Sequence, residues 1–266
     1  MTIEPLLILE LALLGTATGF LAGLLGIGGG MLMVPFITII LTSKGAPADF
    51  AVKMAVATSL ATICFSSLSS VRAHHRRGAV LWPVVRLLVP GILLGSLAGA
   101  QMAVALPGRV LSVLFAIFVA FSATQMLLDR EPKSSRTLPG RWSTFAVGGL
   151  IGVLSSLVGA GGAFISVPFM TWCNIKIHDA VGTSAALGFP IALAGTLGYI
   201  WAGQGVPQMP PGSIGYLYLP GLVVISLASV STAPWGARTA HRMDIRPLRK
   251  VFAFLLYALA AYFLLR

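Results

Sequence analysis

The chain has 266 residues, of which 57% are hydrophobic and only 9% are charged. Because soluble domains carry about 25% charged residues, this composition excludes an ordinary soluble domain and indicates a polytopic membrane protein. The net charge of +11 does not indicate nucleic-acid binding, because the cations lie in short segments between apolar blocks, where they orient membrane proteins.

Eight long apolar blocks follow one another along the chain, and most approach the roughly 20 residues that a helix needs to cross a bilayer. A glycine cluster interrupts the first block and the fifth. This pattern predicts an all-α polytopic membrane protein whose helical segments are 5–25, 30–42, 50–71, 81–105, 109–128, 142–158, 163–173, 180–202, 213–235 and 247–265.

Both interruptions share one pattern, in which glycines precede an apolar run and Val-Pro-Phe. The first copy is Gly26–Phe36 and the second is Gly159–Phe169. Glycine weakens a helix by about 1 kcal/mol per residue relative to alanine. Two copies of such a destabilising feature at equivalent places indicate a functional purpose.

The glycine clusters belong to an internal duplication, with an offset of 133 residues (159 − 26). Three further matches keep the same order: Ala55–Ser59 with Ala180–Ser184, Leu88–Gly91 with Tyr218–Gly221, and Gly99–Leu111 with Gly236–Leu248. Repeated segments in matching order predict two structural repeats, residues 1–128 and 142–266, joined by a charged linker, 129–141.

The distribution of Lys and Arg predicts how the interrupted blocks run. If each block crosses the membrane once, the two sides carry nine cations each. If each block turns back at its glycines, the division becomes fourteen against four, the minority being Lys44, Lys53, Arg109 and Arg266. The positive-inside rule favours the second arrangement, which places the linker in the cytoplasm.

Each repeat then holds a glycine-broken helix pair, either a hairpin or a re-entrant segment, followed by three transmembrane helices. An odd number of crossings inverts the second repeat relative to the first. Inverted repeats with broken helices are a frequent architecture of secondary transporters, whose substrate site lies near the middle of the membrane.

A break inside the membrane leaves backbone N–H and C=O groups without helical partners. A helix that restarts after the break presents free N–H groups and a partial positive charge, which together suit an anion. Two such starts, near Gly30 and Ala163, predict a site for one small anion. The alternative is that the glycines only allow close helix packing, as we expect for Gly15, Gly19 and Gly23.

The candidate anion ligands are backbone groups at the breaks and hydroxyl groups in the next apolar segments. The hydroxyls either donate to the anion or bond to carbonyls of their own helix. The backbone candidates are Gly28, Gly29, Gly30, Met31, Gly161, Gly162, Ala163 and Phe164, and the hydroxyl candidates are Thr58, Ser59, Thr183 and Ser184. The residues expected to shape the helix breaks are Gly26, Pro35, Gly159 and Pro168.

Other site chemistries find little support in the sequence. Cation pathways usually need carboxylates within the membrane, and only Glu10 lies inside an apolar block. The adjacent His74 and His75 lack a useful ligand spacing, so we prefer contact with anionic lipid to a metal site. No nucleophile–base pair or nucleotide-binding loop is recognisable, and we expect no enzymatic activity, no cofactor and no metal.

The motifs together resemble the sulfite exporter TauE/SafE family of bacterial inner-membrane transporters. The segments that carry the resemblance are Gly23–Gly30 with Val34-Pro35, Ala57–Leu60, His74–Val80, Gly159–Pro168 and Val181–Ser184. The resemblance implies a multi-pass protein of the bacterial inner membrane that moves a small sulfur-containing anion or an organic acid. The halves differ, because Ala163 replaces Gly30 and the second half has no counterpart of His74–Val80.

We therefore expect an alternating-access carrier for a small anion such as sulfite or an organosulfonate. An anion channel, a non-transporting membrane scaffold and an intramembrane enzyme are the rival hypotheses. The sequence leaves open the transported anion, the direction of transport, the coupling ion and the formation of a homodimer.

Overall fold

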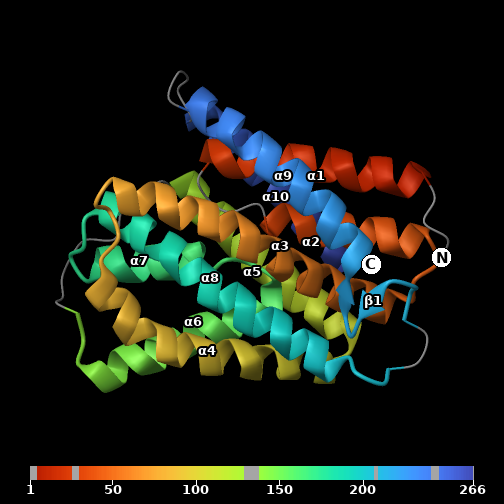
Figure 1. Ribbon diagram of the computed structural model, residues 1–266, viewed down its shortest axis with the longest axis horizontal. Helices are drawn as coiled ribbons and strands as arrows, with labels where there is room; N and C mark the ends of the chain where they lie inside the picture. Colours follow the sequence, from red (N-terminus) through yellow and green to blue (C-terminus); the bar gives the residue numbers. More distant parts are fainter. Residues whose placement is uncertain (1–4, 26–29, 129–137, 207–208, 241–245, 266) are drawn as a thin grey trace.

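The computed structural model describes the backbone of residues 5–25, 30–128, 138–206, 209–240 and 246–265, without the side chains of 22–25, 237–238, 240, 246 and 248–249. Within these ranges the chain is almost entirely helical (Figure 1). The elements are α1 (Pro5–Leu25), α2 (Gly30–Ser43), α3 (Ala48–Arg76), α4 (Trp82–Ala105), α5 (Gly108–Leu128), α6 (Arg141–Val158), α7 (Ala163–Trp172), α8 (Ile177–Ala202), β1 (Ser213–Ile214), β2 (Leu217–Tyr218), α9 (Leu219–Ala240) and α10 (Arg246–Leu265).

Helix length and composition confirm a polytopic membrane protein. Six helices in the described part of the chain, α3, α4, α5, α6, α8 and α9, are long and apolar enough to cross a bilayer. The helices that follow the two glycine clusters are shorter, because α2 has 14 residues and α7 has 10. Neither reaches the roughly 20 residues of a full crossing.

The helices pair across the two halves of the chain. The most extensive packing joins α1 to α9 and α4 to α6. In each pair, one helix belongs to the first half and its neighbour to the second. Between these pairs, α3 packs against α8 at the centre of the bundle, while α5 packs against α10 (Figure 1).

Glycines at matching positions allow both pairs to approach closely. A Cβ at Gly15 of α1 would lie 2.9 Å from Ile225 Cα, and one at Gly19 would lie 2.5 Å from Ser229 Cα. In α6, a Cβ at Gly148 would lie 2.4 Å from the carbonyl oxygen of residue 88 in α4, and one at Gly152 would lie 2.5 Å from that of residue 92. The packing role expected for Gly15 and Gly19 is therefore confirmed.

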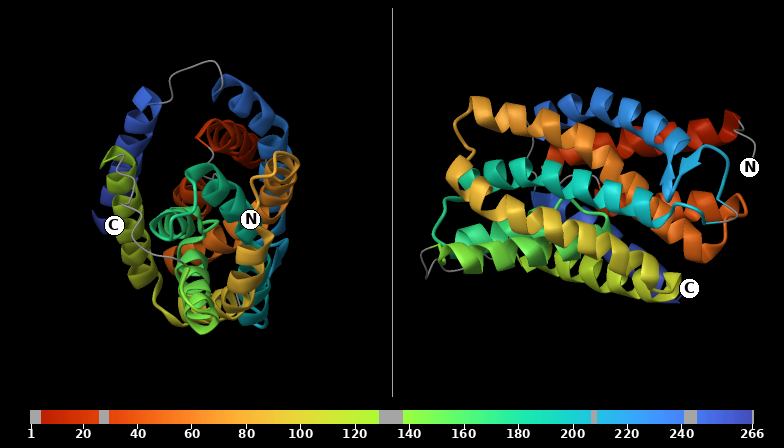
Figure 2. Two further views of the ribbon diagram at one scale, coloured as in Figure 1. Left: turned by 90° about the vertical axis from the view of Figure 1, so that its left-hand side faces the viewer. Right: turned by 60° about the horizontal axis from the view of Figure 1, so that its bottom comes forward.

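The two chain ends lie at the same end of the bundle, as Figure 1 and the right-hand view of Figure 2 show. The opposite end, at the left of Figure 1, holds the junctions between α3 and α4 and between α7 and α8. The first junction is bonded to α8 there, because the Leu81 N–H donates to Thr183 Oγ1 at 3.0 Å. The basic residues Arg72, Arg76, Arg77 and Lys176 lie at these junctions. Lys44, Lys53 and Arg109 lie toward the end that holds the chain termini.

One predicted helical segment begins later than expected. The sequence predicted an apolar helix over 213–235, but a short antiparallel hairpin occupies residues 213–218 and α9 begins at Leu219. Gly212 and Gly215 adopt φ of 82° and 56°, a backbone conformation that glycine tolerates and an α-helix does not use. These two glycines turn the chain before the helix starts.

Candidate functional site

The second glycine cluster separates α6 from α7. Gly159 caps the end of α6 with φ of 70°, and its N–H donates to the Ser155 carbonyl. Gly162 caps the start of α7 with φ of 77°. Both backbone conformations favour glycine over residues with a Cβ. The spacing of Gly159 and Gly162 therefore ends one helix and starts the next.

The start of α7 has free hydrogen-bonding capacity. The Gly162 carbonyl accepts the N–H groups of Ile165 and Ser166, and no side chain caps this end of the helix. The N–H groups of Ala163 and Phe164 have no acceptor among the described residues. Uncapped N–H groups at a helix start carry partial positive charge and favour an anion.

The two glycine breaks touch each other. A Cβ at Gly30, the first residue of α2, would lie 2.7 Å from the Gly159 carbonyl oxygen. Ser59 Oγ donates to that same oxygen at 2.9 Å and lies 3.4 Å from the Gly30 carbonyl oxygen. Ser59 thus connects the start of α2 to the break that precedes α7.

This junction lies at the middle of the bundle. A Cβ at Gly161 would lie 3.6 Å from Ile63 Cγ2, in the middle turns of α3. One at Gly188, in the middle turns of α8, would lie 3.7 Å from the Gly161 carbonyl oxygen. The breaks therefore sit midway along the two central helices, at the depth where inverted-repeat transporters hold their substrates.

The predicted hydroxyl residues are fully or almost fully buried, and each has a protein partner in this conformation. Thr58 Oγ1 accepts the Tyr218 N–H at 3.2 Å, as Thr183 Oγ1 accepts the Leu81 N–H. Ser184 Oγ lies 2.7 Å from Ser166 Oγ. The structure thus brings Ser59 to the breaks and bonds Thr58 and Thr183 to the chain just before α9 and α4.

The remaining predicted residues fall in three places. Gly26, Gly28 and Gly29 lie outside the described residues. Met31 is buried in the first turn of α2. Pro35 and Pro168 lie inside helices that continue past them. Because proline lacks an N–H group, each removes one backbone hydrogen bond near a helix start without ending the helix.

The sequence reasoning missed two hydroxyl residues near the second break. Ser155 Oγ and Ser156 Oγ are buried without a hydrogen-bond partner among the described residues. Ser155 Oγ lies 3.1 Å from the point that a Cβ on Gly162 would occupy. Comparing the repeats at the 133-residue offset would have revealed the two serines, because Ala22 and Gly23 stand at the equivalent positions.

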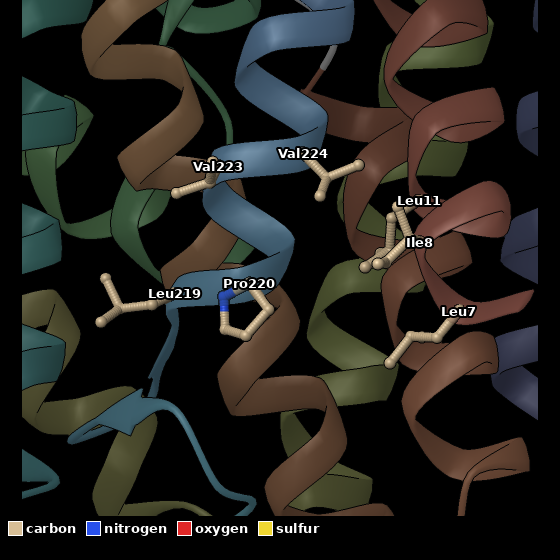
Figure 3. A pocket seen from close by; sticks show the side chains of 7 residues that line it. All are labelled: Leu7, Ile8, Leu11, Leu219, Pro220, Val223 and Val224. Carbon is tan, nitrogen blue, oxygen red and sulfur yellow. The ribbon is translucent and has the colours of Figure 1, made fainter. Parts of the chain in front are cut away.

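An apolar crevice of about 300 Å³ lies away from the breaks, between α1 and the start of α9. Figure 3 shows Leu7 and Leu11 of α1 and Pro220 and Val224 of α9 among its lining side chains. Its exposed members, Ile8 and Val223, place it at the surface of the bundle. The crevice offers only apolar side chains, so it does not suit an anion.

Comparisons with known proteins agree with the membrane architecture. The family profile described as "Sulfite exporter TauE/SafE" matches residues 11–263. No solved structure shows significant similarity to the chain.

Three curated relatives are named as probable membrane transporter proteins. One from Haemophilus influenzae is 35% identical, covering 95% of this chain and 96% of its own length. One from Methanocaldococcus jannaschii is 25% identical, covering 98% and 97%. The protein YdhB from Bacillus subtilis is 29% identical over 74% of this chain and 79% of its own. With a family match over nearly its whole length, this membrane protein belongs to the sulfite exporter TauE/SafE family.

Proposed function

We propose that the protein is a secondary transporter that moves a small anion across the bacterial inner membrane by alternating access. The observation that carries this proposal is the uncapped start of α7, which presents the N–H groups of Ala163 and Phe164 midway along the bundle. A site of this kind attracts an anion without a basic side chain. The family name supports sulfite or another sulfur-containing anion or organosulfonate as the substrate.

The packing of the helices supports two inverted repeats, 1–128 and 142–266. Gly15 and Gly19 of α1 correspond to Gly148 and Gly152 of α6 at the offset of 133 residues. Their contacts correspond as well, because residues 225 and 229 of α9 lie 137 positions (225 − 88) beyond residues 88 and 92 of α4. Such an exchange of equivalent partners is what a pseudo-two-fold axis produces. The contacts therefore pair Leu88 with Ile225, whereas the sequence match pairs Leu88 with Tyr218, which lies seven residues earlier.

The threonines add a second exchange. Thr58 of α3 accepts an N–H from the residue before α9, and Thr183 of α8 accepts one from the residue before α4. The threonine of each repeat therefore bonds to the equivalent position of the other repeat, the residue just before its fourth helix. A reciprocal contact favours two equivalent bodies that rock against each other, as alternating access requires.

The proposed site lies between the two helix starts. Its backbone ligands are the N–H groups around Gly28–Met31 and Gly161–Phe164, with Ser59 and Ser184 as candidate hydroxyl donors. In this conformation the Ser59 hydroxyl donates its hydrogen bond to the Gly159 carbonyl, so Ser59 can donate to an anion only after that bond opens. Movement of one repeat relative to the other would open this hydrogen bond. Thr58 and Thr183 are candidate ligands in the conformation that results.

Orientation follows from the basic residues. The end that holds Arg72, Arg76, Arg77 and Lys176 is the positive end of the bundle, and the positive-inside rule makes it cytoplasmic. The chain termini then lie on the outer side. The exposed apolar side chains of the bundle contact membrane lipid.

Counterflow in proteoliposomes tests the proposal. Vesicles that contain the purified protein and unlabelled sulfite or thiosulfate should accumulate the ³⁵S-labelled anion transiently, with a rate that saturates. Saturation and counterflow distinguish a carrier from a channel. Flux without either property would indicate a channel, and no flux for any tested sulfur oxyanion, sulfonate or carboxylate would favour a scaffold.

A further inference from the structure

The hydroxyl of Ser155 is placed at the start of α7 without a protein partner. Ser155 is 0% exposed, its Oγ has no hydrogen-bond partner among the described residues, and this atom lies 3.1 Å from the point that a Cβ on Gly162 would occupy. Gly162 is the cap of the ten-residue helix α7. A buried polar atom therefore faces a helix start that has free N–H groups.

A purely structural role does not account for this hydroxyl. Serines within membrane helices commonly donate to a carbonyl of the preceding turn, as Ser122 Oγ does to the Phe118 carbonyl at 2.9 Å. Ser155 makes no such bond. A buried polar group without a partner costs free energy, which a bound ligand would recover.

We propose that Ser155 is a direct ligand of the transported anion and determines its affinity at the second break, an inference that rests on the proposed transport function. The hydroxyl donates to one oxygen of the anion. The N–H groups of Ala163 and Phe164 donate to the same anion from the start of α7.

The two repeats then contribute unequally. Ala22 and Gly23 stand where the second repeat has Ser155 and Ser156, so the first break has no equivalent hydroxyls. Ser156 Oγ, which has no hydrogen-bond partner among the described residues, lies 3.0 Å from the point that a Cβ on Gly195 would occupy. These two serines place hydroxyls without partners at the second break.

The surrounding residues restrict the class of anion. Beyond Arg141 in α6, throughout α7, and beyond Asp179 in α8, the sequence contains no charged residue and no histidine. The donors are therefore neutral, and no carboxylate is present in these segments to accept a proton from the ligand. Ile151 and Ile191 flank Gly162 closely. This environment suits a small oxyanion whose bound oxygens carry no proton.

Two substitutions and a matched control test the assignment in the purified full-length protein. Ser155→Ala should raise the Kd for sulfite or thiosulfate by about tenfold to a hundredfold, because a hydrogen bond to a charged ligand is lost. Ser122→Ala changes a serine of equal burial that bonds to its own helix, and it should leave the Kd unchanged. Isothermal titration gives both values.

Ser155→Asp separates ligand binding from folding. The free N–H groups and the helix dipole at the start of α7 offset part of the cost of burying a carboxylate there, so the ligand-free variant should still fold, with an unfolding temperature at or somewhat below that of the wild type. The same carboxylate occupies the position of the anion, so the affinity for sulfite and for thiosulfate should fall more than a hundredfold.

The outcomes distinguish this inference from the transport proposal. A Kd of Ser155→Ala equal to that of a wild-type protein that binds and exchanges the anion would overturn the role of Ser155 and leave the transport proposal intact. Absence of binding and counterflow in the wild-type protein, for every anion tested, would overturn both.

Discussion

The two glycine breaks share a sequence pattern but differ in the residues that precede it. At the second break, Gly159 and Gly162 both adopt positive φ, and the hydroxyl of Ser155 faces the start of α7 without a partner. At the first break, the described part of the chain begins with Gly30, which packs against the Gly159 carbonyl oxygen and Ser59. The first break thus supports the second through direct contact.

Under the proposed function, this difference gives a duplicated architecture an asymmetric ligand site. The helix packing keeps its equivalence at Gly15 and Gly148, where any side chain would separate the helices. The lining of the breaks is free of that restriction, and there Ala22 has Ser155 as its counterpart. We infer that packing maintains the symmetry of the two repeats, whereas ligand recognition has concentrated in one of them.

Substitution of the break glycines should give the largest effect. Gly162→Val should abolish counterflow, because the residue combines φ of 77° with a Cβ position 2.5 Å from Ile191 Cδ1. A residue with a Cβ in this backbone region costs about 1–3 kcal/mol before any crowding. Gly30→Ala meets crowding alone, at 2.7 Å from the Gly159 carbonyl oxygen, and should retain part of the activity.

Gly205→Val is the matched control for backbone strain. Gly205 has φ of 78°, and its Cβ position has no atom within 4 Å. This variant should lose some thermal stability and keep wild-type counterflow. Wild-type counterflow in Gly162→Val, at equal expression, would remove the backbone site from the proposed mechanism.

Local sequence patterns predicted most of the fold. The apolar segments 81–105 and 109–128 correspond to α4 and α5 within one residue at each end, because uninterrupted apolar runs determine membrane helices. The glycine clusters likewise predicted the end of α6 and the start of α7. These features depend on neighbouring residues in the chain, which a sequence displays directly.

The partners of the hydroxyl groups could not be predicted in this way. Thr58 bonds to a residue 160 positions later, and Thr183 to one 102 positions earlier. Such pairs depend on the arrangement of the two halves in space. The free hydroxyl of Ser155 depends likewise on how α7 and α8 pack around it. A sequence shows that a serine is present, but not that its hydrogen bond is missing.

Side-specific labelling tests whether the two halves are inverted. Cysteines introduced at Arg76 and Lys176, in a background without Cys64 and Cys173, should react with an impermeant maleimide only from the cytoplasmic side. A cysteine at Gln204, an exposed residue in the α8–β1 connection, should react only from the outer side. Inside-out and right-side-out vesicles give the comparison.

The expected pattern follows from the return of each broken block to its starting side. If Arg76 and Lys176 reacted from opposite sides, the broken block between them would cross the membrane once. The second half would then have the same orientation as the first. That result would remove the inverted repeat, while leaving the roles proposed for Gly162 and Ser155 to be judged by their own variants.

The reciprocal threonines should give the smallest effects and the most direct measure of symmetry. Thr58→Val and Thr183→Val each leave a backbone N–H, of Tyr218 or Leu81, without its acceptor. A buried N–H without a partner costs about 1–3 kcal/mol, and each kcal/mol lowers the unfolding temperature by about 2–4 °C in a protein of this size. The loss should be somewhat smaller for Thr183→Val, because its bond is only partly buried and water can replace the acceptor.

Thr16→Val is the control for the two threonine variants, since Thr16 is exposed and bonds to its own helix, and it should change the unfolding temperature little. A large loss at one threonine with none at the other would show that the two contacts do not perform equivalent structural roles, and the pseudo-two-fold relation would then rest on the glycine contacts of α1 and α6 alone.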